Sequence, residues 1–307
     1  MIYHRFGENR FPSTNTPVAQ LEDHIRLLQE GDFQILALPE IVASLLGKGP
    51  PLPEKTVAIT VDDAFASVYR EAFPRLQAAG MPFTLFVATD EIDRGGAAFM
   101  TWDQIRELAA AGVTIGAHSA SHGHMADHPQ ELVTADLARS NQRFLEELGA
   151  IPDLFAYPYG EFSLETKELA AAAGYTVAFG QQSGVANRAS DPFALPRFPM
   201  NQAYGNEERF LLAVKALPFP VHDVRPADPL IVENPPSFAF SVDSQVVGPA
   251  DIACYAPGMG TVPVSRREER VTVTLTKAFP VGRARINCTQ WAAPERFRWY
   301  GVQFLVR

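Results

Sequence analysis

The first 222 residues alternate between short apolar, β-branched runs and amphipathic helical runs, and this alternation limits the fold more than any other feature. A glycine follows the end of most predicted helices, at Gly47, Gly80, Gly112, Gly149 and Gly174. Glycine is favoured there because it adopts a left-handed conformation without a Cβ clash. Strand–helix alternation is typical of a parallel sheet with right-handed crossovers. We therefore predict an α/β barrel with six or seven strands, incomplete or distorted in shape.

The size and charge of the chain limit the classes of protein to which it can belong. A barrel of this kind takes roughly 250 residues, so a chain of 307 residues has room for an appendage. A net charge of −9 argues against a nucleic-acid partner, which would select a basic face. The sequence holds no apolar run of about 18 residues, so we predict no transmembrane segment. The oligomeric state is left open.

The pattern changes after residue 222. Prolines punctuate the stretch between residues 218 and 236, and short runs with a period of two follow it. We predict a barrel over residues 1–222 and an antiparallel β region over residues 223–307, which either forms a small accessory sandwich or packs on the barrel. Both cysteines, Cys254 and Cys288, fall in this region. They either pair in an oxidising compartment or remain two buried thiols.

Ionisable side chains follow two of the predicted strands. Asp62 and Asp63 end the run Thr56–Val61, and His118 ends the run Val113–Ala117, with His122 four residues later. In a barrel the C-terminal strand ends meet on one face. Two histidines and one carboxylate there make a three-ligand metal site with room for water. A histidine-rich surface loop is the alternative, because the histidine spacing alone is a weak signal.

The aspartate pair favours the metal site. Adjacent carboxylates are costly to bury without a cation. If Asp63 binds the metal, Asp62 can stay ionised as a general base. A third strand end carries Tyr157-Pro158-Tyr159-Gly160, where a backbone N–H could face a developing oxyanion. A simple turn with aromatic packing explains that fragment equally well.

These three segments, taken in order, resemble the first three motifs of the polysaccharide deacetylase family, the NodB-homology domains of carbohydrate esterase family 4. The motifs are Thr60-Val61-Asp62-Asp63, His118-Ser119-x-x-His122 and Tyr157-Pro158-Tyr159-Gly160. The resemblance covers residues 2–222. The opening Tyr3-His4-Arg5-Phe6 is similar to the first strand of the poly-N-acetylglucosamine de-N-acetylase branch.

The resemblance implies a distorted (β/α)7 barrel of NodB-homology type. It implies that Asp63, His118 and His122 hold one divalent metal ion, usually Zn²⁺, with Co²⁺, Ni²⁺ or Mn²⁺ as alternatives. Asp62 would be the general base, and the backbone N–H of Tyr159 would help to hold the oxyanion.

The implied activity is hydrolysis of N-acetyl groups on an amino-sugar polymer, which would be the partner of this protein. Poly-N-acetylglucosamine, chitin-like chains and peptidoglycan are the candidates. A deacylase or deformylase of a small or lipid-linked amino sugar is one alternative, and a carbohydrate-binding protein on a degenerate barrel is another.

The sequence departs from the family in three places. Ala64 stands where the first motif usually has glycine, and Ala156 stands where the third motif often has a base-orienting arginine. The late Leu-x-His motif that carries the general acid is not clear. Arg197 and His222 are the candidates for the missing arginine and the missing acid.

The predicted cellular location of the protein depends on the family resemblance. The chain opens on Met1-Ile2-Tyr3-His4 without a secretory signal, and this opening is similar to the end of a strand, so a trimmed N-terminus is considered. The resemblance favours a periplasmic or secreted protein. Trp291, Trp299 and Tyr300 of the β region either stack on carbohydrate or pack between the two parts of the chain.

Overall fold

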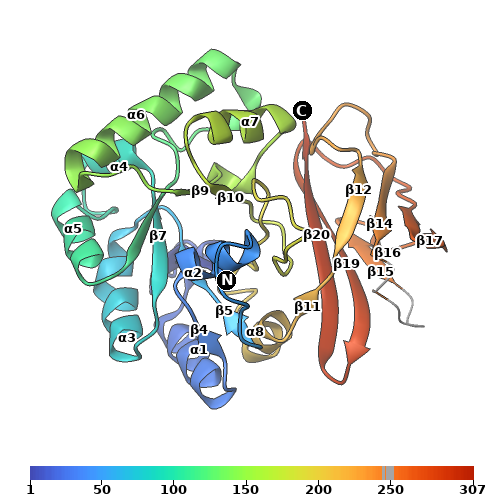
Figure 1. The fold of residues 1–307 in the computed structure, drawn as a ribbon, viewed down its shortest axis with the longest axis horizontal. Coiled ribbons are helices and arrows are strands. Elements are labelled where there is room, and N and C mark those ends of the chain that lie inside the picture. The colour runs from blue at the N-terminus through green and yellow to red at the C-terminus, as the bar shows by residue number, and fades with distance from the viewer. Residues whose placement is uncertain (244–245, 247–251) are drawn as a thin grey trace.

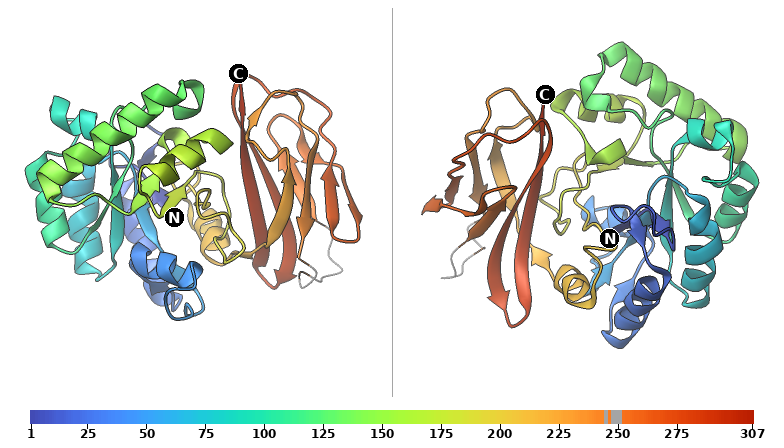
Figure 2. Two further views of the ribbon diagram at one scale, coloured as in Figure 1. Left: turned by 45° about the horizontal axis from the view of Figure 1, so that its top comes forward. Right: turned by 180° about the vertical axis from the view of Figure 1, so that it is seen from behind.

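A computed structural model describes residues 1–243, 246 and 252–307. The chain forms an α/β barrel followed by a β-sandwich, which stand side by side in every view (Figures 1 and 2). In the described residues, no helix has the length and apolar character needed to span a membrane.

A six-stranded parallel sheet forms the wall of the barrel. Its strand order is β1-β6-β7-β8-β9-β10. The strands are β1 (Ile2–Tyr3), β6 (Ile59–Val61), β7 (Phe83–Val87), β8 (Thr114–Ala117), β9 (Leu154–Ala156) and β10 (Val177–Phe179). Every pairing along it is parallel. The predicted fold class is therefore confirmed, and all the carboxyl ends of these strands meet on one face.

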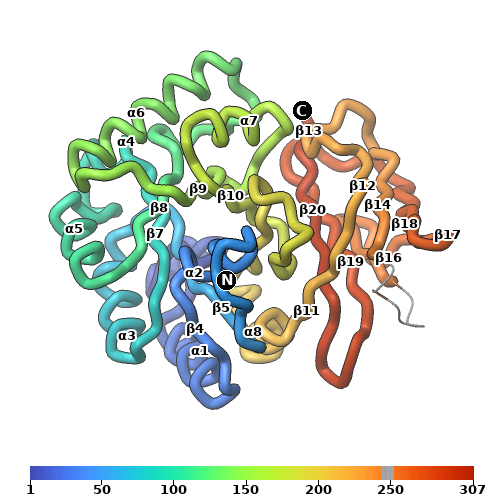
Figure 3. Tube along the Cα trace, viewed as in Figure 1, coloured from blue at the N-terminus to red at the C-terminus, as the bar shows by residue number. Residues whose placement is uncertain are grey.

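Helices cover the outside of this sheet, as the ring of coils in Figure 3 shows. They are α1 (Val18–Glu30), α2 (Leu38–Leu45), α3 (Phe73–Ala78), α4 (Thr89–Arg94), α5 (Trp102–Ala110), α6 (Gln130–Leu148), α7 (Leu164–Ala172) and α8 (Glu207–Val214). Short pairs add β2 (Arg5–Phe6) with β3 (Asn15–Thr16), and β4 (Gln34–Ile35) with β5 (Thr56–Val57). Trp102 begins α5 after the capping residue Thr101, and its ring packs against Phe144.

An irregular segment closes the barrel and explains its distortion. Leu195 pairs with Phe179 of β10, and Pro199 pairs with Ile2 of β1, so residues 195–199 lie between the two edge strands. Prolines and single bridges take the place of a regular seventh strand there. Arg197 lies at the centre of this segment.

Two sheets form the sandwich. The first has the order β11-β20-β19-β15-β16, with β13 also beside β20, and the second has the order β12-β14-β18-β17. The strands are β11 (Leu217–Pro218), β12 (Val221–Arg225), β13 (Leu230–Ile231), β14 (Phe238–Val242), β15 (Ala253–Ala256), β16 (Gly260–Val262), β17 (Val264–Arg267), β18 (Arg270–Val273), β19 (Gly282–Ala293) and β20 (Arg296–Val306). Residue 222 falls inside β12, and the division into two domains at that point stays a prediction.

The sandwich core is apolar and cross-linked. Phe238, Phe240 and Phe304 are fully buried between the sheets. Cys254 and Cys288 face each other in the β15–β19 ladder and form a disulfide. Of the two alternatives for these cysteines, the structure has the paired one.

The first sheet of the sandwich packs on the barrel. The Trp299 ring contacts Phe198 edge-on at 5.4 Å and lies under the Arg209 guanidinium. Trp299 therefore serves packing between the two parts of the chain. Trp291 is about half exposed, at 54%.

Candidate active site

The carboxylate pair lies directly past the end of β6. Asp62 is fully buried and receives two hydrogen bonds from Arg197, Nη1 to Oδ1 at 2.7 Å and Nη2 to Oδ2 at 2.9 Å. The closing segment of the barrel thus brings Arg197 to the predicted base. Burial alone would raise the pKa of Asp62, but the adjacent Arg197 guanidinium offsets burial and helps to hold this pKa below its usual value. Asp62 is therefore ionised at neutral pH.

Arg197 is itself held in place by burial and by hydrogen bonds to other groups of the barrel. It is 3% exposed, and its Nε donates to the carbonyl of Gly180 at 2.9 Å. Nη1 also donates to Thr60 Oγ1 at 3.1 Å. A buried bidentate pair of this kind fixes the direction of both carboxylate oxygens.

The neighbouring carboxylate meets both predicted histidines. Asp63 Oδ1 lies 3.3 Å from His118 Nε2 and 3.0 Å from His122 Nε2. His118 Nδ1 lies 2.6 Å from the carbonyl of Ala156, which can only accept, so the proton sits on Nδ1 and Nε2 offers its lone pair. Asp63, His118 and His122 come from two neighbouring strand ends, as the sequence predicts.

The three ligand atoms fit a metal ion. They lie within 4.8 Å of one another. Asp63 Oδ1 and His118 Nε2 are buried, and neither has a hydrogen-bond partner among the described residues. Such orphaned atoms are costly unless something satisfies them. One carboxylate oxygen and two imidazole nitrogens form a ligand set that zinc accepts while it keeps an open position.

The loops around this cluster adopt an unusual backbone conformation. Asp63, Ala64, Ser119, His122 and Tyr159 have φ values of 74°, 54°, 64°, 55° and 60°. Each such residue costs about 1–3 kcal/mol when it is not glycine, and such residues gather at functional sites. A glycine at position 64 would therefore relieve strain, because glycine adopts positive φ without a Cβ clash.

The Tyr159 turn lies beside the cluster. The Tyr159 ring stacks on His124 at 4.1 Å and meets the edge of His122 at 4.6 Å. Gly160 has φ 69°, and a Cβ there would lie 2.5 Å from the backbone N of Gln181. Only glycine fits at this position, which fixes the path of the turn.

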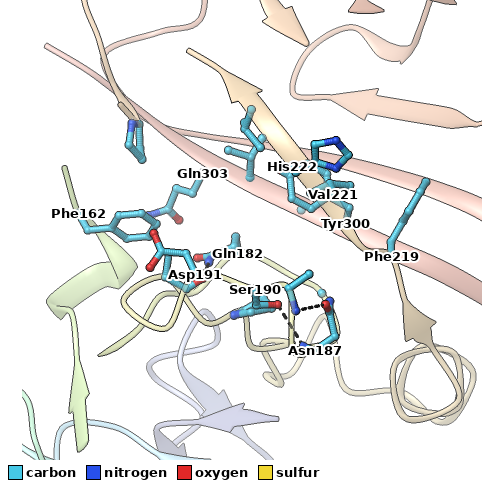
Figure 4. A pocket seen from close by; sticks show the side chains of 18 of the residues that line it. Phe162, Gln182, Asn187, Ser190, Asp191, Phe219, Val221, His222, Tyr300 and Gln303 are labelled. Atoms are coloured by element: carbon cyan, nitrogen blue, oxygen red, sulfur yellow. Dashed lines mark hydrogen bonds between the residues drawn. The ribbon is translucent and has the colours of Figure 1, made fainter. Parts of the chain in front are cut away.

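His222 lies elsewhere. It is on β12 of the sandwich, about half exposed, with its Nε2 3.8 Å from Asp223. It lines a cavity of about 360 Å³ between the sandwich and the barrel, and the residues that line this cavity include neither aspartate of the cluster and neither of its histidines (Figure 4). The structure does not bring His222 to the cluster, because the barrel has already closed at residue 199.

Two groups near the cluster have no role that was predicted from the sequence. His4 follows β1, whose neighbour is β6, and it interacts electrostatically with Asp63 and Asp62; burial lowers its pKa. His124 contacts Glu161 at 2.6 Å. The strand-end position of His4 was the available signal, whereas nothing in the sequence relates Glu161 to His124.

Comparisons with known proteins relate the barrel to one family of enzymes. Residues 49–178 match the model of the polysaccharide deacetylase family. YxkH of Bacillus subtilis is 27% identical over 197 residues, which cover 64% of this chain and 69% of YxkH. The poly-β-1,6-N-acetyl-D-glucosamine N-deacetylase of Escherichia coli K12 is 28% identical over 234 residues. That match covers 62% of this chain but only 34% of the E. coli protein.

Solved structures show the same barrel. IcaB from Ammonifex degensii superposes with a TM-score of 0.59 and 28% identity, covering 66% of this chain and 91% of IcaB. The Streptococcus pyogenes deacetylase PplD, in complex with acetate, shares the fold with a TM-score of 0.64 and 21% identity over 70% of this chain and 96% of PplD.

Fold and family together define an α/β-barrel hydrolase that acts on amide bonds. Residues 49–178 of the chain are similar to the polysaccharide deacetylase family, and the barrel resembles solved deacetylase structures. The predicted family and enzyme class are confirmed.

Proposed function

We propose that this protein removes N-acetyl groups from an amino-sugar polymer, with poly-N-acetylglucosamine, chitin-like chains and peptidoglycan as candidate substrates. The observation that carries the proposal is the ionised Asp62, clamped by Arg197 next to the cluster of Asp63, His118 and His122. The E. coli relative that acts on poly-β-1,6-N-acetyl-D-glucosamine supports the choice of substrate class.

Each residue receives a role from its surroundings. Asp63 Oδ1, His118 Nε2 and His122 Nε2 would hold a divalent ion, Zn²⁺ in preference to Co²⁺, Ni²⁺ or Mn²⁺, which when bound supplies a Lewis acid. Asp62 takes a proton from the attacking water, and Arg197 keeps its carboxylate ionised and oriented.

The developing oxyanion and the leaving group need two further contributions. The backbone N–H of Tyr159 donates to the oxyanion. Because His222 lies apart from the cluster, we assign the proton that the leaving amine needs to Asp62, which holds one after the first step.

The buried ion pair of Asp62 and Arg197 also bears on the alternative functions. A carbohydrate-binding protein on a degenerate barrel has no need of a buried, ionised aspartate, and burial of such a pair is costly unless it is used or compensated. We further propose an extracytoplasmic location, because the Cys254–Cys288 disulfide requires an oxidising compartment.

Acetate release from N-acetylglucosamine oligomers, with and without a chelator, tests the proposal. We expect release by the metal-loaded protein and its loss with the chelator. Asp62→Asn should retain metal while turnover falls roughly 10²–10⁴-fold, because this residue moves a proton. His118→Ala and His122→Ala should lose both metal and activity.

The matched control is His128→Ala, which removes an exposed histidine outside the cluster and should keep both metal and turnover. Elemental analysis of each variant gives the metal content. Absence of acetate release from every N-acetylated oligomer by the metal-loaded protein would refute the hydrolytic proposal. Loss of metal from Asp62→Asn would refute the division of roles between the two aspartates.

A further inference from the structure

We propose that the β-sandwich is a working part of the active site, with Gln303 and Arg283 as positioning residues for the Tyr159–Gly160 turn. The inference rests on the proposed function, because it assigns these side chains to the turn whose N–H faces the oxyanion. The family model ends at residue 178, so this contribution comes from a part of the chain beyond the matched region.

The sandwich approaches the barrel along β19 and β20. Every second side chain of a strand points to the same face of the sheet. In the β19–β20 ladder, Arg285 lies opposite Gln303, and Asn287 lies opposite Gly301. A Cβ on Gly301 would lie 2.2 Å from the carbonyl oxygen of Ser183 in the barrel, so only glycine permits this close approach.

Gln303 makes the central contact. Its side chain points from β20 toward Phe162 of the barrel (Figure 4) and is 2% exposed. Its Nε2 donates to the carbonyl of Gly160 at 2.9 Å and of Tyr159 at 3.3 Å. Arg285 Nε donates to Gln303 Oε1 at 2.7 Å. That bond fixes which end of the amide faces the turn, because only the NH₂ end can donate to carbonyls.

Arg283 adds a second contact from β19. Its Nη1 donates to the carbonyl of Tyr159 at 3.3 Å, and its guanidinium lies 5.6 Å from the centre of the Tyr159 ring. Its Nε is 3.6 Å from Glu161 Oε1. The sandwich therefore holds the carbonyl of Tyr159 with two side chains and the ring of Tyr159 with one.

The turn needs this support because its conformation is unfavourable. Tyr159 and Gly160 both lie in the left-handed region, with φ values of 60° and 69°. A residue with a Cβ is disfavoured there and persists only where its surroundings hold it. If the carbonyl bonds were lost, the turn would relax and its N–H would swing away from the oxyanion.

The test compares zinc-loaded Gln303→Leu and Arg283→Ala with the parent protein. Loss of one oxyanion donor costs about 10²–10³-fold in kcat, and a misplaced one costs less. We expect kcat to fall roughly 10- to 100-fold in Gln303→Leu and less in Arg283→Ala, with KM and metal content nearly unchanged. Arg266→Ala on β17 is the matched control, because that exposed arginine bonds within its own hairpin, to the carbonyl of Glu268.

Amide hydrogen exchange over residues 157–161 provides a readout that does not need turnover. The inference requires faster exchange at this turn in Gln303→Leu while the rest of the barrel stays protected. If the parent releases acetate and both variants keep its kcat, the inference fails while the proposed function stands. If the parent is inactive, the proposed function fails, and unchanged exchange at the turn would overturn the positioning role as well. Should Gln303→Leu not fold, Arg283→Ala decides, because its side chain is 41% exposed.

Discussion

The barrel and the sandwich bury different chemistry. The barrel interior holds an ion pair and buried histidines, and its strand ends carry residues in the left-handed region. The sandwich core is built of phenylalanines and aliphatic side chains around one disulfide. Buried polar groups cost stability unless they are satisfied, whereas apolar burial and cross-links add stability directly. The buried polar groups of the barrel therefore reduce its stability and serve the chemistry of the site, whereas the core and the disulfide of the sandwich make that part more stable.

The disulfide gives the largest expected effect on stability. Its two cysteines are 34 residues apart, and in the chain-entropy model a cross-link over such a loop contributes about 4 kcal/mol. Cys254→Ala combined with Cys288→Ala should therefore destabilise the sandwich by several kcal/mol and the barrel much less. Calorimetry with and without a reductant measures this. The same loss in both parts would show that they unfold as one unit.

Tryptophan fluorescence helps to distinguish unfolding of the sandwich from unfolding of the barrel. The sandwich carries Trp291 and Trp299, and the barrel carries Trp102. Trp102→Phe leaves the fluorescence of Trp291 and Trp299, which reports on the sandwich and on its contact with the barrel. In that background the fluorescence transition should move with the disulfide variant, while activity at low temperature should stay close to that of the parent.

The second prediction concerns a buried histidine of the barrel. His24 is 1% exposed, stacks on Phe210 at 3.9 Å and lies 2.9 Å from the hydroxyl of Tyr3. Burial lowers its pKa to about 4, from 6.5 in the unfolded chain. Between these values the unfolded state binds more protons, so stability falls as the pH drops from 6.5 to 4. This group alone accounts for about 3 kcal/mol at pH 4.

His24→Gln tests whether the loss of stability toward acidic pH comes from His24. The variant should be less stable than the parent at pH 7, and its stability should fall less steeply toward pH 4. Urea unfolding at several pH values, followed by far-ultraviolet circular dichroism, gives the two slopes. Parallel slopes would mean that His24 is not held neutral in the folded barrel.

The sequence predicted the fold where local rules decide it. Buried β-branched runs and closing glycines defined the parallel sheet, and the period-two runs defined the β region. The closure of the barrel by residues 195–199 was not predicted, because that segment has no periodic pattern and is ordered by edge contacts with β1 and β10.

The site was predictable to the same degree. Asp62, Asp63, His118 and His122 stand at strand ends, and strand ends meet on one face, so local sequence sufficed to gather them. Gln303 and the Arg283 contact were out of reach, because they arise from packing between parts of the chain that lie 124 to 144 residues apart. His222 was chosen by its position near the end of the barrel, and tertiary structure placed it in the sandwich.

The smallest expected effect tests whether strain at the site is real. Ala64 has φ 54° and is fully buried, whereas Ala88 is 1% exposed and has φ −89°. Replacement of either by glycine loses one methyl group and adds unfolded-state entropy, but only Ala64→Gly also relieves a left-handed conformation worth about 1–2 kcal/mol. Ala64→Gly should therefore cost about 1–2 kcal/mol less than Ala88→Gly. Equal losses in urea unfolding would mean that the turn after Asp63 stores no strain, and that the contrast with the sandwich rests on buried polar groups alone.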